Sequence, residues 1–330
     1  MAASERSASI IGTGSYLPQK VLRNADLEKM VDTSDEWIST RTGIKERRIA
    51  SPEETTSLMA TRAAEHALAD AGLGPEKVQL IIVATFTGDM LMPATACLVQ
   101  RNIGAPQAAA FDLSAACTGF LYALSVARSL IVSGAYDYIL AIAAEKLSFV
   151  TDWTDRNTCV LFGDGAGAAV VSSERRGPRI VDEYLGADGS IYELLSMPGG
   201  GCLHPTSHET VDQRLHFVKM SGREVFKYAV NSMVEAAKKL VERHNLSPGD
   251  IRLLVPHQAN KRIITEVGRH LGIPADRVYM NIEKYGNMSA ATTAVGMDEA
   301  FRNNEFKPGD KVLLVAFGGG FTWGAVLLEW

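Results

Sequence analysis

Two stretches of this sequence share one layout and decide the fold. Leu73-Gly74-Pro75-Glu76 leads into an apolar run at residues 78–83, and Leu246-Ser247-Pro248-Gly249 leads into an apolar run at residues 251–256. The offset between the two stretches is 173 residues, 246 minus 73. A turn that feeds the same kind of buried strand twice, about half a chain apart, indicates that one folding unit is present in two copies.

Two further matches support the duplication. Tyr136-Asp137-Tyr138-Ile139-Leu140 corresponds to Gly309-Asp310-Lys311-Val312-Leu313 at the same offset of 173, and Ser114-Ala115-Ala116-Cys117-Thr118 corresponds to Ser289-Ala290-Ala291-Thr292-Thr293 at an offset of 175. In the second match, Cys117 takes the place of Thr292. Because duplicated folds commonly keep structure in both halves and chemistry in one, we predict an N-terminal half at residues 1–174 that carries a reactive cysteine, and a C-terminal half at residues 175–330.

Apolar runs alternate with helical periods along both halves. We predict helices at residues 56–71, 120–133, 222–244 and 261–271, where apolar residues recur at intervals of three and four. We predict strands at residues 9–12, 78–85, 109–113, 138–144, 167–172, 179–184, 251–256, 278–281, 312–317 and 322–328. Nearly continuous apolar strands among amphipathic helices indicate an α/β protein whose sheets are covered on both faces.

Composition excludes several classes of protein. The 330 residues are 46% hydrophobic and 22% charged, the ordinary globular mixture, and the net charge of −5 without a basic block argues against nucleic-acid binding. The four cysteines form no CxxC pair, so we expect neither a disulfide scaffold nor a metal site. The uncharged stretch 312–328 contains three glycines, which favours two strands around a turn over a membrane span. The first six residues do not resemble a signal peptide, so we expect a cytoplasmic protein with no membrane association.

Cys117 is the first candidate for chemistry. It follows a strand-like run and stands at the first turn of the helix predicted at residues 120–133. Unpaired N–H groups and the positive end of a helix dipole stabilise a thiolate, so we expect the pKa of Cys117 to lie below its reference value of about 8.5. Most single cysteines are structural, however, and a catalytic role for Cys117 therefore depends on partners.

Two polar residues and a glycine turn are candidates for these partners. His257 ends an apolar strand, and Asn287 follows Gly286 after another strand-like segment. An imidazole and an amide can both donate hydrogen bonds to one carbonyl oxygen, whereas an acid–base triad would place a carboxylate behind the histidine. Three consecutive glycines suggest that a backbone N–H approaches a ligand, as in Gly318-Gly319-Gly320. The run Gly163-Asp164-Gly165-Ala166-Gly167 lacks the spacing of a dinucleotide loop, which argues against NAD.

Taken together, several motifs make the chain similar to the 3-oxoacyl-[acyl-carrier-protein] synthase III family over residues 9–330. Each motif is weak alone, and their common order is specific. They are Gly12-Thr13-Gly14-Ser15-Tyr16-Leu17-Pro18, Asp35-Glu36-Trp37-Ile38, Arg41-Thr42-Gly43-Ile44, Ala115-Ala116-Cys117, Phe162-Gly163-Asp164-Gly165-Ala166-Gly167-Ala168, Pro256-His257-Gln258-Ala259-Asn260, Tyr285-Gly286-Asn287 and Gly318-Gly319-Gly320-Phe321-Thr322-Trp323-Gly324.

The resemblance implies a fold and a reaction. The fold is the thiolase-like, five-layered αβαβα arrangement with internally duplicated halves, and the assembly is a homodimer. The reaction is a decarboxylative Claisen condensation, in which acetyl-CoA and malonyl-acyl-carrier protein give acetoacetyl-acyl-carrier protein, CO2 and CoA without a cofactor. By the same resemblance, Cys117 takes the acetyl group, His257 and Asn287 assist decarboxylation and stabilise the enolate, and the backbone N–H groups of Cys117 and Gly319 form the oxyanion hole.

The resemblance also implies substrate contacts. Trp37 and Arg156 would stack on the adenine of CoA, and further CoA and pantetheine contacts would be Thr33, Arg41, Gly222, Phe226, Ala259 and Asn260. The acidic carrier protein would meet Arg262 together with Gln258, Lys261, Lys227 and Arg269. Met92 stands where relatives often have the phenylalanine that reaches the neighbouring subunit's acyl pocket. Because methionine is narrower and more flexible, we expect primers somewhat longer than acetyl to be accepted.

Three alternatives remain open on the sequence. A secondary-metabolite or alkylquinolone-type ketosynthase would share the same motifs. A non-catalytic CoA-binding or acyl-carrier partner on this scaffold would have no use for Cys117, His257 and Asn287 together. A cysteine hydrolase would need a carboxylate to orient His257, and no such residue is evident.

Overall fold

Nine strands form a single hydrogen-bonded array in the computed structural model, which describes residues 6–330. The order in space is β11-β12-β13-β8-β1-β7-β6-β4-β5. Residues 1–5, in the segment compared above with signal peptides, lie outside the described residues. The strands are β1 (Ser9–Tyr16), β4 (Leu80–Ala84), β5 (Ala109–Leu113), β6 (Tyr138–Lys146), β7 (Asp164–Ser172), β8 (Arg179–Ala187), β11 (Ile251–Pro256), β12 (Lys311–Gly318) and β13 (Thr322–Glu329).

The array consists of two sheets that meet at a narrow junction. Between the sheets, β1 and β8 pair in register only at Ser9 and Arg179. The first sheet has the order β5-β4-β6-β7-β1, and the second has the order β11-β12-β13-β8. At the free edge of β11, Leu254 forms one further bridge to Val278. The expected strand at 278–281 is therefore wrong, since only this single bridge forms.

Both sheets repeat one pattern of strand directions. In each sheet the first strand pairs are parallel and the later ones antiparallel. Leu80 pairs with Ile139 and Leu253 pairs with Val312, so equivalent pairs are separated by 173 residues on both strands. The internal duplication is therefore present in the topology. The division at residues 174 and 175 stays a prediction, and it falls in the link between β7 and β8.

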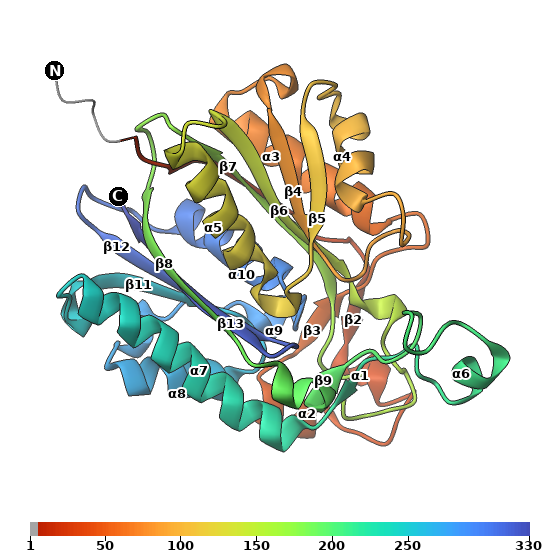
Figure 1. Cartoon of the computed structure of the whole chain (residues 1–330). Coiled ribbons are helices and arrows are strands. Elements are labelled where there is room, and N and C mark those ends of the chain that lie inside the picture. The colour runs from red at the N-terminus through yellow and green to blue at the C-terminus, as the bar shows by residue number, and fades with distance from the viewer. Residues whose placement is uncertain (1–5) are drawn as a thin grey trace, which may run out of the picture.

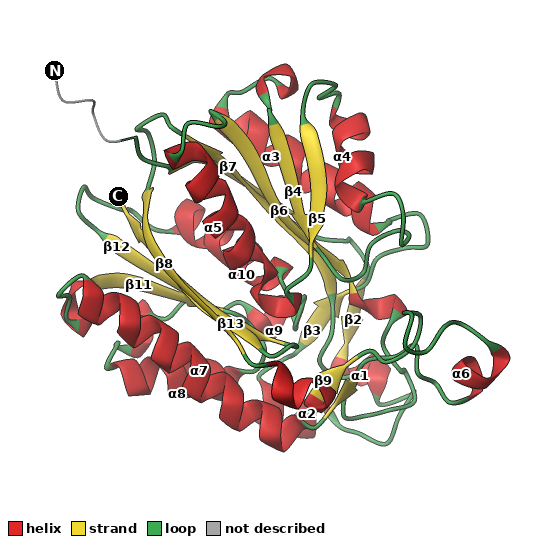
Figure 2. Ribbon diagram, in the orientation of Figure 1, coloured by secondary structure: helices red, strands yellow, loops and turns green. Residues whose placement is uncertain are grey.

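Helices separate and cover the two sheets, as Figures 1 and 2 show. α3 (Thr56–Ala71) and α4 (Thr95–Ile103) cover the first sheet, and α7 (Gly222–Arg243) and α8 (Lys261–Leu271) cover the second. α5 (Gly119–Val132) and α10 (Ala291–Asn303) lie between the sheets. The resulting αβαβα order confirms the predicted fold class.

Short elements connect the layers. They are β2 (Val21–Arg23), β3 (Glu46–Arg48), β9 (Leu195–Ser196), β10 (Lys219–Met220), α1 (Asn24–Leu27), α2 (Asp35–Thr42), α6 (His208–Asp212) and α9 (Ile282–Tyr285). Single 3₁₀ turns occupy Pro75–Lys77, Ala116–Thr118, Leu147–Phe149, Gly189–Leu194, Pro248–Asp250 and Ala275–Arg277.

The helices differ in how well their bounds can be predicted from the sequence. The predicted bounds of α3 and α8 are confirmed to the residue, and those of α5 and α7 are confirmed to within one residue. α10 has no predicted counterpart, because the run from Ala291 to Asp298 is buried on every side and shows no apolar stripe. The stretch 312–328 forms the antiparallel pair β12 and β13, as predicted. Among the described residues, none of the helices combines the length and apolar character needed to cross a membrane.

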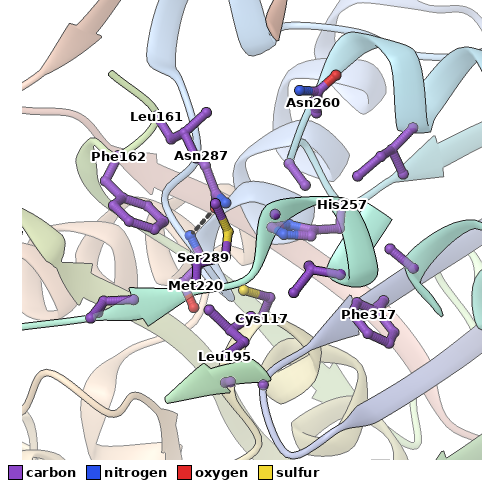
Figure 3. Close-up of a pocket in the computed structure, with 18 of the residues that line it drawn as sticks. Cys117, Leu161, Phe162, Leu195, Met220, His257, Asn260, Asn287, Ser289 and Phe317 are labelled. Atoms are coloured by element: carbon purple, nitrogen blue, oxygen red, sulfur yellow. Dashed lines mark hydrogen bonds between the residues drawn. The ribbon is translucent and has the colours of Figure 1, made fainter. Parts of the chain in front are cut away.

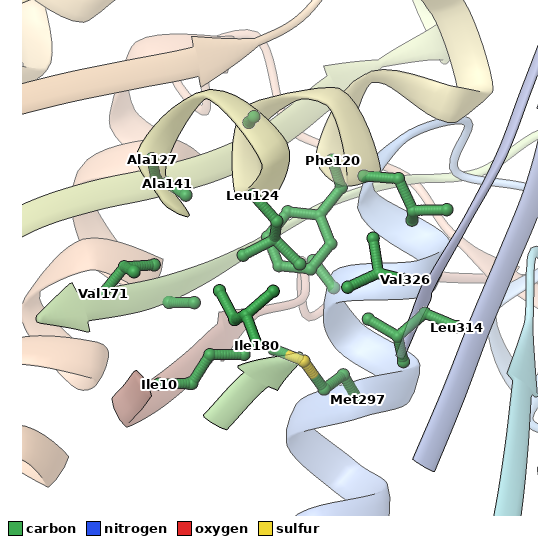
Figure 4. Packing of buried hydrophobic residues seen from close by; sticks show 14 of the residues in the cluster. Ile10, Phe120, Leu124, Ala127, Ala141, Val171, Ile180, Met297, Leu314 and Val326 are labelled. Atoms are coloured by element: carbon green, nitrogen blue, oxygen red, sulfur yellow. The ribbon is translucent and has the colours of Figure 1, made fainter. Parts of the chain in front are cut away.

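The central layer is packed from both sides. Phe120, Leu124 and Ala127 of α5 are fully buried, and they belong to the same hydrophobic cluster as Leu314 and Val326 of the second sheet (Figure 4). The same cluster contains residues of the first sheet, such as Ala141 and Val171. The start of α5, which carries Cys117 on the preceding turn, is therefore held by residues of both halves.

Phe120→Ala tests this packing. We expect the substitution to lower the free energy of unfolding by about 3–5 kcal/mol, because a fully buried ring is lost from a layer that both sheets hold in place. Phe149, which is 55% exposed, provides the matched control, and Phe149→Ala should cost less than about 1 kcal/mol. Urea unfolding followed by circular dichroism measures both values. Equal losses for the two variants would contradict the assignment of Phe120 to the core.

Candidate active site

One cavity of about 240 Å³ brings together the central site residues predicted from the sequence. Cys117, His257 and Asn287 line it (Figure 3), and so does Gly319. Four predicted substrate contacts line the same cavity, namely Gly222, Phe226, Ala259 and Asn260. The remaining wall is mainly apolar, with Phe86, Leu147, Leu161, Phe162, Leu195, Val218, Met220 and Phe317. The N-terminal half supplies the cysteine, and the C-terminal half supplies the histidine and the asparagine.

Cys117 lies in the 3₁₀ turn Ala116–Thr118 that leads into α5. Removal from water raises the pKa of its thiol to about 12, and interaction with the Ser289 hydroxyl opposes only part of this rise. The predicted lowering of the pKa is therefore wrong for the resting protein, because loss of hydration outweighs the favourable end of the helix. The thiol carries its proton until a substrate arrives.

The turn before α5 is repeated before α10. Ala116 has φ = 44° and Ser289 has φ = 50°, a left-handed conformation that is uncommon for residues other than glycine. Ser289 follows Ala116 by 173 residues, the offset that also relates the strands. Cys117 therefore corresponds to Ala290. The earlier pairing of Cys117 with Thr292 is wrong by two residues, since it followed a chance similarity of small side chains.

His257 is buried at the end of β11 and has a defined tautomer. Its Nδ1 lies 2.5 Å from Thr292 Oγ1, and the Thr292 hydroxyl donates to the Ser289 carbonyl oxygen at 2.8 Å. A hydroxyl has one proton, so the proton between Nδ1 and Thr292 is assigned to the imidazole, and Nε2 keeps a lone pair. Burial lowers the pKa of His257 to about 3, which keeps the ring neutral. The prediction that neutral His257 donates to substrate is wrong for Nε2 in this state.

Asn287, unlike His257, presents a hydrogen-bond donor to the cavity. Its Oδ1 accepts a hydrogen bond from the Ser289 backbone N–H at 2.8 Å (Figure 3). Because a backbone N–H can only donate, this contact identifies the oxygen and leaves Nδ2 as the donor available to the cavity. The Asn287 backbone bonds to Leu161 and Gly163, at 2.8 and 2.9 Å, so a residue of the C-terminal half is fastened to the N-terminal half.

The glycine turn between β12 and β13 lies against the cysteine. A Cβ atom at Gly318 would stand 2.6 Å from the Cys117 backbone nitrogen, too close for any residue with a side chain. The Thr322 hydroxyl donates to the Ala115 carbonyl oxygen at 3.0 Å from the other end of the same turn. The backbone of Gly319 is thereby placed at the cavity beside that of Cys117.

Two polar residues near the thiol have no counterpart in the sequence predictions. Ser289 lines the cavity, and Glu145 is fully buried near the end of β6. Burial raises the pKa of Glu145 to about 8, although Thr85, Thr87 and the Phe86 backbone N–H donate to its Oε2. The signal that could have revealed Glu145 is one carboxylate at the end of an otherwise apolar run, YILAIAAEK. Within residues 6–330, no group of three or more His, Cys, Asp or Glu side chains could hold a metal ion.

The predicted adenine contacts lie outside the residues that line the cavity. Arg156 places its guanidinium carbon 4.6 Å from the centre of the Trp37 ring, and Arg41 lies 5.9 Å from the same centre. Asn260 links this group to the cavity that it lines, because its Nδ2 donates to the Arg41 carbonyl oxygen at 3.1 Å. Thr33 is half-buried, and its hydroxyl has no hydrogen-bond partner in the part of the chain that the structure describes.

The predicted carrier-protein contacts divide into two groups. Lys227, Lys261, Arg262 and Arg269 are exposed on α7 and α8. Gln258 is fully buried, and its side chain bonds to the backbone of Pro256, Tyr279, Asn281 and Ile282. The prediction that Gln258 meets a carrier protein is therefore wrong, since all of its polar atoms serve the fold. Met92 is 85% exposed in the loop after β4.

Comparisons with known proteins agree with this geometry. Family models described as the 3-oxoacyl-[acyl-carrier-protein] synthase III C terminal and 3-oxoacyl-[acyl-carrier-protein] synthase III match residues 241–330 and 111–189. A β-ketoacyl-[acyl-carrier-protein] synthase III of Caldanaerobacter subterraneus is 55% identical over 98% of both chains.

Solved structures give the same result. The crystal structure of 3-oxoacyl-[acyl-carrier-protein] synthase III from Aquifex aeolicus is 50% identical with a TM-score of 0.90, covering 98% of this chain and 100% of that one. A priming β-ketosynthase of the R1128 polyketide biosynthetic pathway is 36% identical with a TM-score of 0.91, covering 100% of this chain and 98% of that one. The chain therefore belongs to the 3-oxoacyl-[acyl-carrier-protein] synthase III family, the condensing enzymes that initiate fatty acid synthesis.

Proposed function

We propose that Cys117 accepts the acyl group of a short acyl-CoA and that the same cavity then condenses it with malonyl-acyl-carrier protein. The observation that carries this assignment is the meeting of Cys117, Asn287 and the Gly318–Gly319 backbone in one apolar cavity. The enzyme acts as a cytoplasmic homodimer, and its substrates are acetyl-CoA or a short acyl-CoA and malonyl-acyl-carrier protein. The chemistry needs no metal ion or organic cofactor, since each step uses side chains and backbone amides.

Acyl transfer begins with attack of the Cys117 sulfur on the thioester carbonyl. The carbonyl oxygen gains negative charge and accepts hydrogen bonds from the backbone N–H groups of Cys117 and Gly319. The close packing at Gly318, where a Cβ atom would stand 2.6 Å from the Cys117 nitrogen, supports this pairing, because the two segments lie near each other only without a side chain there. The apolar wall shields the acyl-cysteine from water until the second substrate arrives.

Decarboxylation of the malonyl group leaves an enolate, whose oxygen needs donors. Asn287 provides one through Nδ2, since Oδ1 is occupied by Ser289. His257 can donate through Nε2 only while it carries a second proton, because Nδ1–H is directed to Thr292. The negative enolate favours that protonated form, so His257 takes a proton from solvent as the enolate develops, donates through Nε2 during this step, and returns the proton to solvent once the enolate has reacted.

The substrates reach the cavity along the exposed side near α2 and α8. Trp37 offers one face of its indole to the CoA adenine, with Arg156 on the ring. Phe226 and Asn260 guide the pantetheine arm to Cys117, assisted by Thr33, Arg41, Gly222 and Ala259. The cationic cluster of Lys227, Lys261, Arg262 and Arg269 receives the acidic carrier protein.

Two alternatives lose support from particular observations. A cysteine hydrolase requires a carboxylate behind the histidine, and Nδ1 of His257 bonds to the Thr292 hydroxyl instead. A polyketide-priming synthase shares the fold, but the similarity to that protein, 36%, is lower than the 55% to a fatty-acid enzyme. The fatty-acid and the polyketide-priming functions can be separated by comparing the rates of condensation with malonyl-carrier proteins of fatty-acid and of polyketide type.

Cys117→Ala tests the acyl-enzyme. Wild-type protein mixed with acetyl-CoA should gain one acetyl group in an intact-mass measurement, and Cys117→Ala should gain none, because the thiol proposed to carry the acetyl group is removed. Cys97→Ala is the control, since Cys97 is an exposed free thiol on α4 and its loss should leave the adduct unchanged. An adduct that persists in Cys117→Ala would refute the assignment.

Asn287→Asp tests the enolate donor. The carboxylate retains an oxygen for the Ser289 N–H and replaces the donating Nδ2 by a second acceptor. We expect CO2 release from malonyl-acyl-carrier protein to fall by about 10²–10³-fold, the usual effect of losing one such donor, while acetylation of Cys117 persists. Radiolabelled CO2 release and intact mass measure the two steps. Unchanged decarboxylation would show that Asn287 is not the donor.

Met92→Phe tests the primer preference. If Met92 extends into the acyl cavity of the second subunit, the larger ring should reduce turnover of hexanoyl-CoA and butyryl-CoA relative to acetyl-CoA by at least about tenfold, the lower end of the effect of one methylene in an apolar pocket. Leu91→Phe is the control, because Leu91 is equally exposed in the same loop. A wild-type enzyme that already rejects both longer primers would contradict the prediction.

A further inference from the structure

Two buried polar atoms beside the thiol lack the partners that buried polar atoms normally have. Ser289 is 2% exposed and Glu145 is fully buried. The Ser289 Oγ and the Glu145 Oε1 each have no well-formed hydrogen bond among the described residues. Buried hydroxyl and carboxyl oxygens are usually paired, so two neighbouring exceptions at a reactive cysteine indicate a functional arrangement.

The Ser289 hydroxyl lies between the thiol and the carboxyl. It is close enough to lower the pKa of Cys117 on one side and the pKa of Glu145 on the other, although neither contact has ideal hydrogen-bond geometry. Figure 3 shows Ser289 and Cys117 close to each other at the cavity that both residues line. A charge on Glu145 also raises the pKa of Cys117, which is consistent with the two groups being close. Cys117, Ser289 and Glu145 thus form a line of polar groups, of which Cys117 and Ser289 border the apolar cavity and Glu145 is buried in the protein.

The reaction needs such a line because a proton must leave the thiol and later return. Cys117 is protonated at rest, and it must lose its proton when the acyl–sulfur bond forms. His257 is poorly suited to keep that proton through the acyl-enzyme stage, because burial without a counter-charge disfavours its imidazolium form. A group that accepts the proton and remains uncharged afterwards is better suited to an apolar cavity.

We propose that Ser289 relays the Cys117 proton to Glu145, which stores it as a neutral carboxylic acid until condensation regenerates the thiol. The inference rests on the proposed function, since it assigns the proton of the same acyl transfer.

The proton transfers balance over both half-reactions. In the first, the sulfur–acyl bond forms and the CoA thioester bond breaks. The thiol proton passes to the Ser289 oxygen while the Ser289 proton passes to the Glu145 carboxylate, and the departing CoA thiolate takes a proton from water. In the second, CO2 leaves the malonyl group, the enolate carbon takes the acyl group, and the released Cys117 thiolate regains its proton from Glu145 through Ser289. Each turnover thus consumes one proton from solvent, and the protein returns to its initial state.

The surroundings of Glu145 suit this task. Thr85, Thr87 and the Phe86 N–H all donate to Oε2 and stabilise the carboxylate, while burial stabilises the neutral acid. The titratable group that faces Glu145 is Cys117, and the adjacent Lys146 directs its ammonium to carbonyl oxygens of Ser51 and Glu54 instead. A carboxyl whose pKa lies near 8 can both take and return a proton close to neutrality.

The test measures the rate of Cys117 acetylation by acetyl-CoA in rapid-quench experiments with intact-mass detection, from pH 6 to pH 10. In the wild type the rate should rise with pH as Glu145 ionises and level off above about pH 8. Glu145→Gln should be slower by about 10²-fold at pH 7.5, the scale of general-base catalysis, and its rate should keep rising without a plateau because only the thiol then titrates. Ser289→Ala should show the same profile.

The double variant distinguishes a relay from two structural effects. Because Ser289 and Glu145 act on one proton, Glu145→Gln with Ser289→Ala should be no slower than either single variant. Glu183→Gln is the control. Glu183 is a largely buried glutamate on β8 that pairs with Arg128 of α5, and its variant should keep the wild-type pH profile. Thermal melting verifies that each variant is folded, and Ser289→Ala, a small change at the cavity wall, keeps the test available if Glu145→Gln unfolds.

Three outcomes overturn the relay. A wild-type plateau in Glu145→Gln, additive losses in the double variant, or a plateau that shifts only with His257 substitutions would each assign the proton elsewhere. Failure of the proposed function has a different signature, the absence of any acetyl adduct on Cys117 in the wild type.

Discussion

Exclusion of water from the cavity determines the protonation state of the groups around Cys117. The same cause raises the pKa of the thiol to about 12, raises that of Glu145 to about 8 and lowers that of His257 to about 3. Each group is driven toward its neutral form, because an apolar wall offers little compensation for a charge. The site is therefore best understood as a neutral thiol and a neutral imidazole beside one carboxyl, Glu145, whose pKa lies close enough to neutrality for it to take and return a proton. The nearby helix end alone does not keep a permanent thiolate in this environment.

Such a cavity exists only where the two halves interlock. Gly318 leaves no room for a side chain against the Cys117 backbone nitrogen, and the Thr322 hydroxyl bonds to the Ala115 carbonyl oxygen, so the C-terminal hairpin packs against the turn that carries Cys117. In the other direction, the backbone of Asn287 bonds to Leu161 and Gly163 of the N-terminal half. Neither half alone supplies Cys117 together with His257 and Asn287. Duplication of the fold thus created the seam in which the chemistry takes place.

The sequence predicts the architecture far better than the chemistry of its groups. The sequence predicts the bounds of helices with one apolar stripe, such as α3 and α8, to the residue. It does not predict α10, because a helix that is buried on all sides has no apolar stripe. Strand ends and the family resemblance located Cys117, His257 and Asn287, which the structure brings to one cavity. The protonation states were wrong, and Gln258 was misplaced, because both depend on burial and on hydrogen bonds from distant segments. Glu145 and Ser289 were missed for the same reason, since their proximity to the thiol arises only in three dimensions.

Internal symmetry explains how neutral groups can still stabilise transient anions. The left-handed residues Ala116 and Ser289 mark equivalent turns, and each turn leads into a helix of the central layer. Both residues line the cavity, so the N-terminal ends of α5 and α10 approach it together. The unpaired N–H groups and dipoles of these ends favour negative charge without being charged themselves. An oxyanion or enolate that forms between them is stabilised at once, and the cavity returns to neutrality when that charge is transferred. One duplicated turn therefore supplies Cys117 from its first copy and, from its second, the Ser289 hydroxyl and the Asn287 amide that line the same cavity.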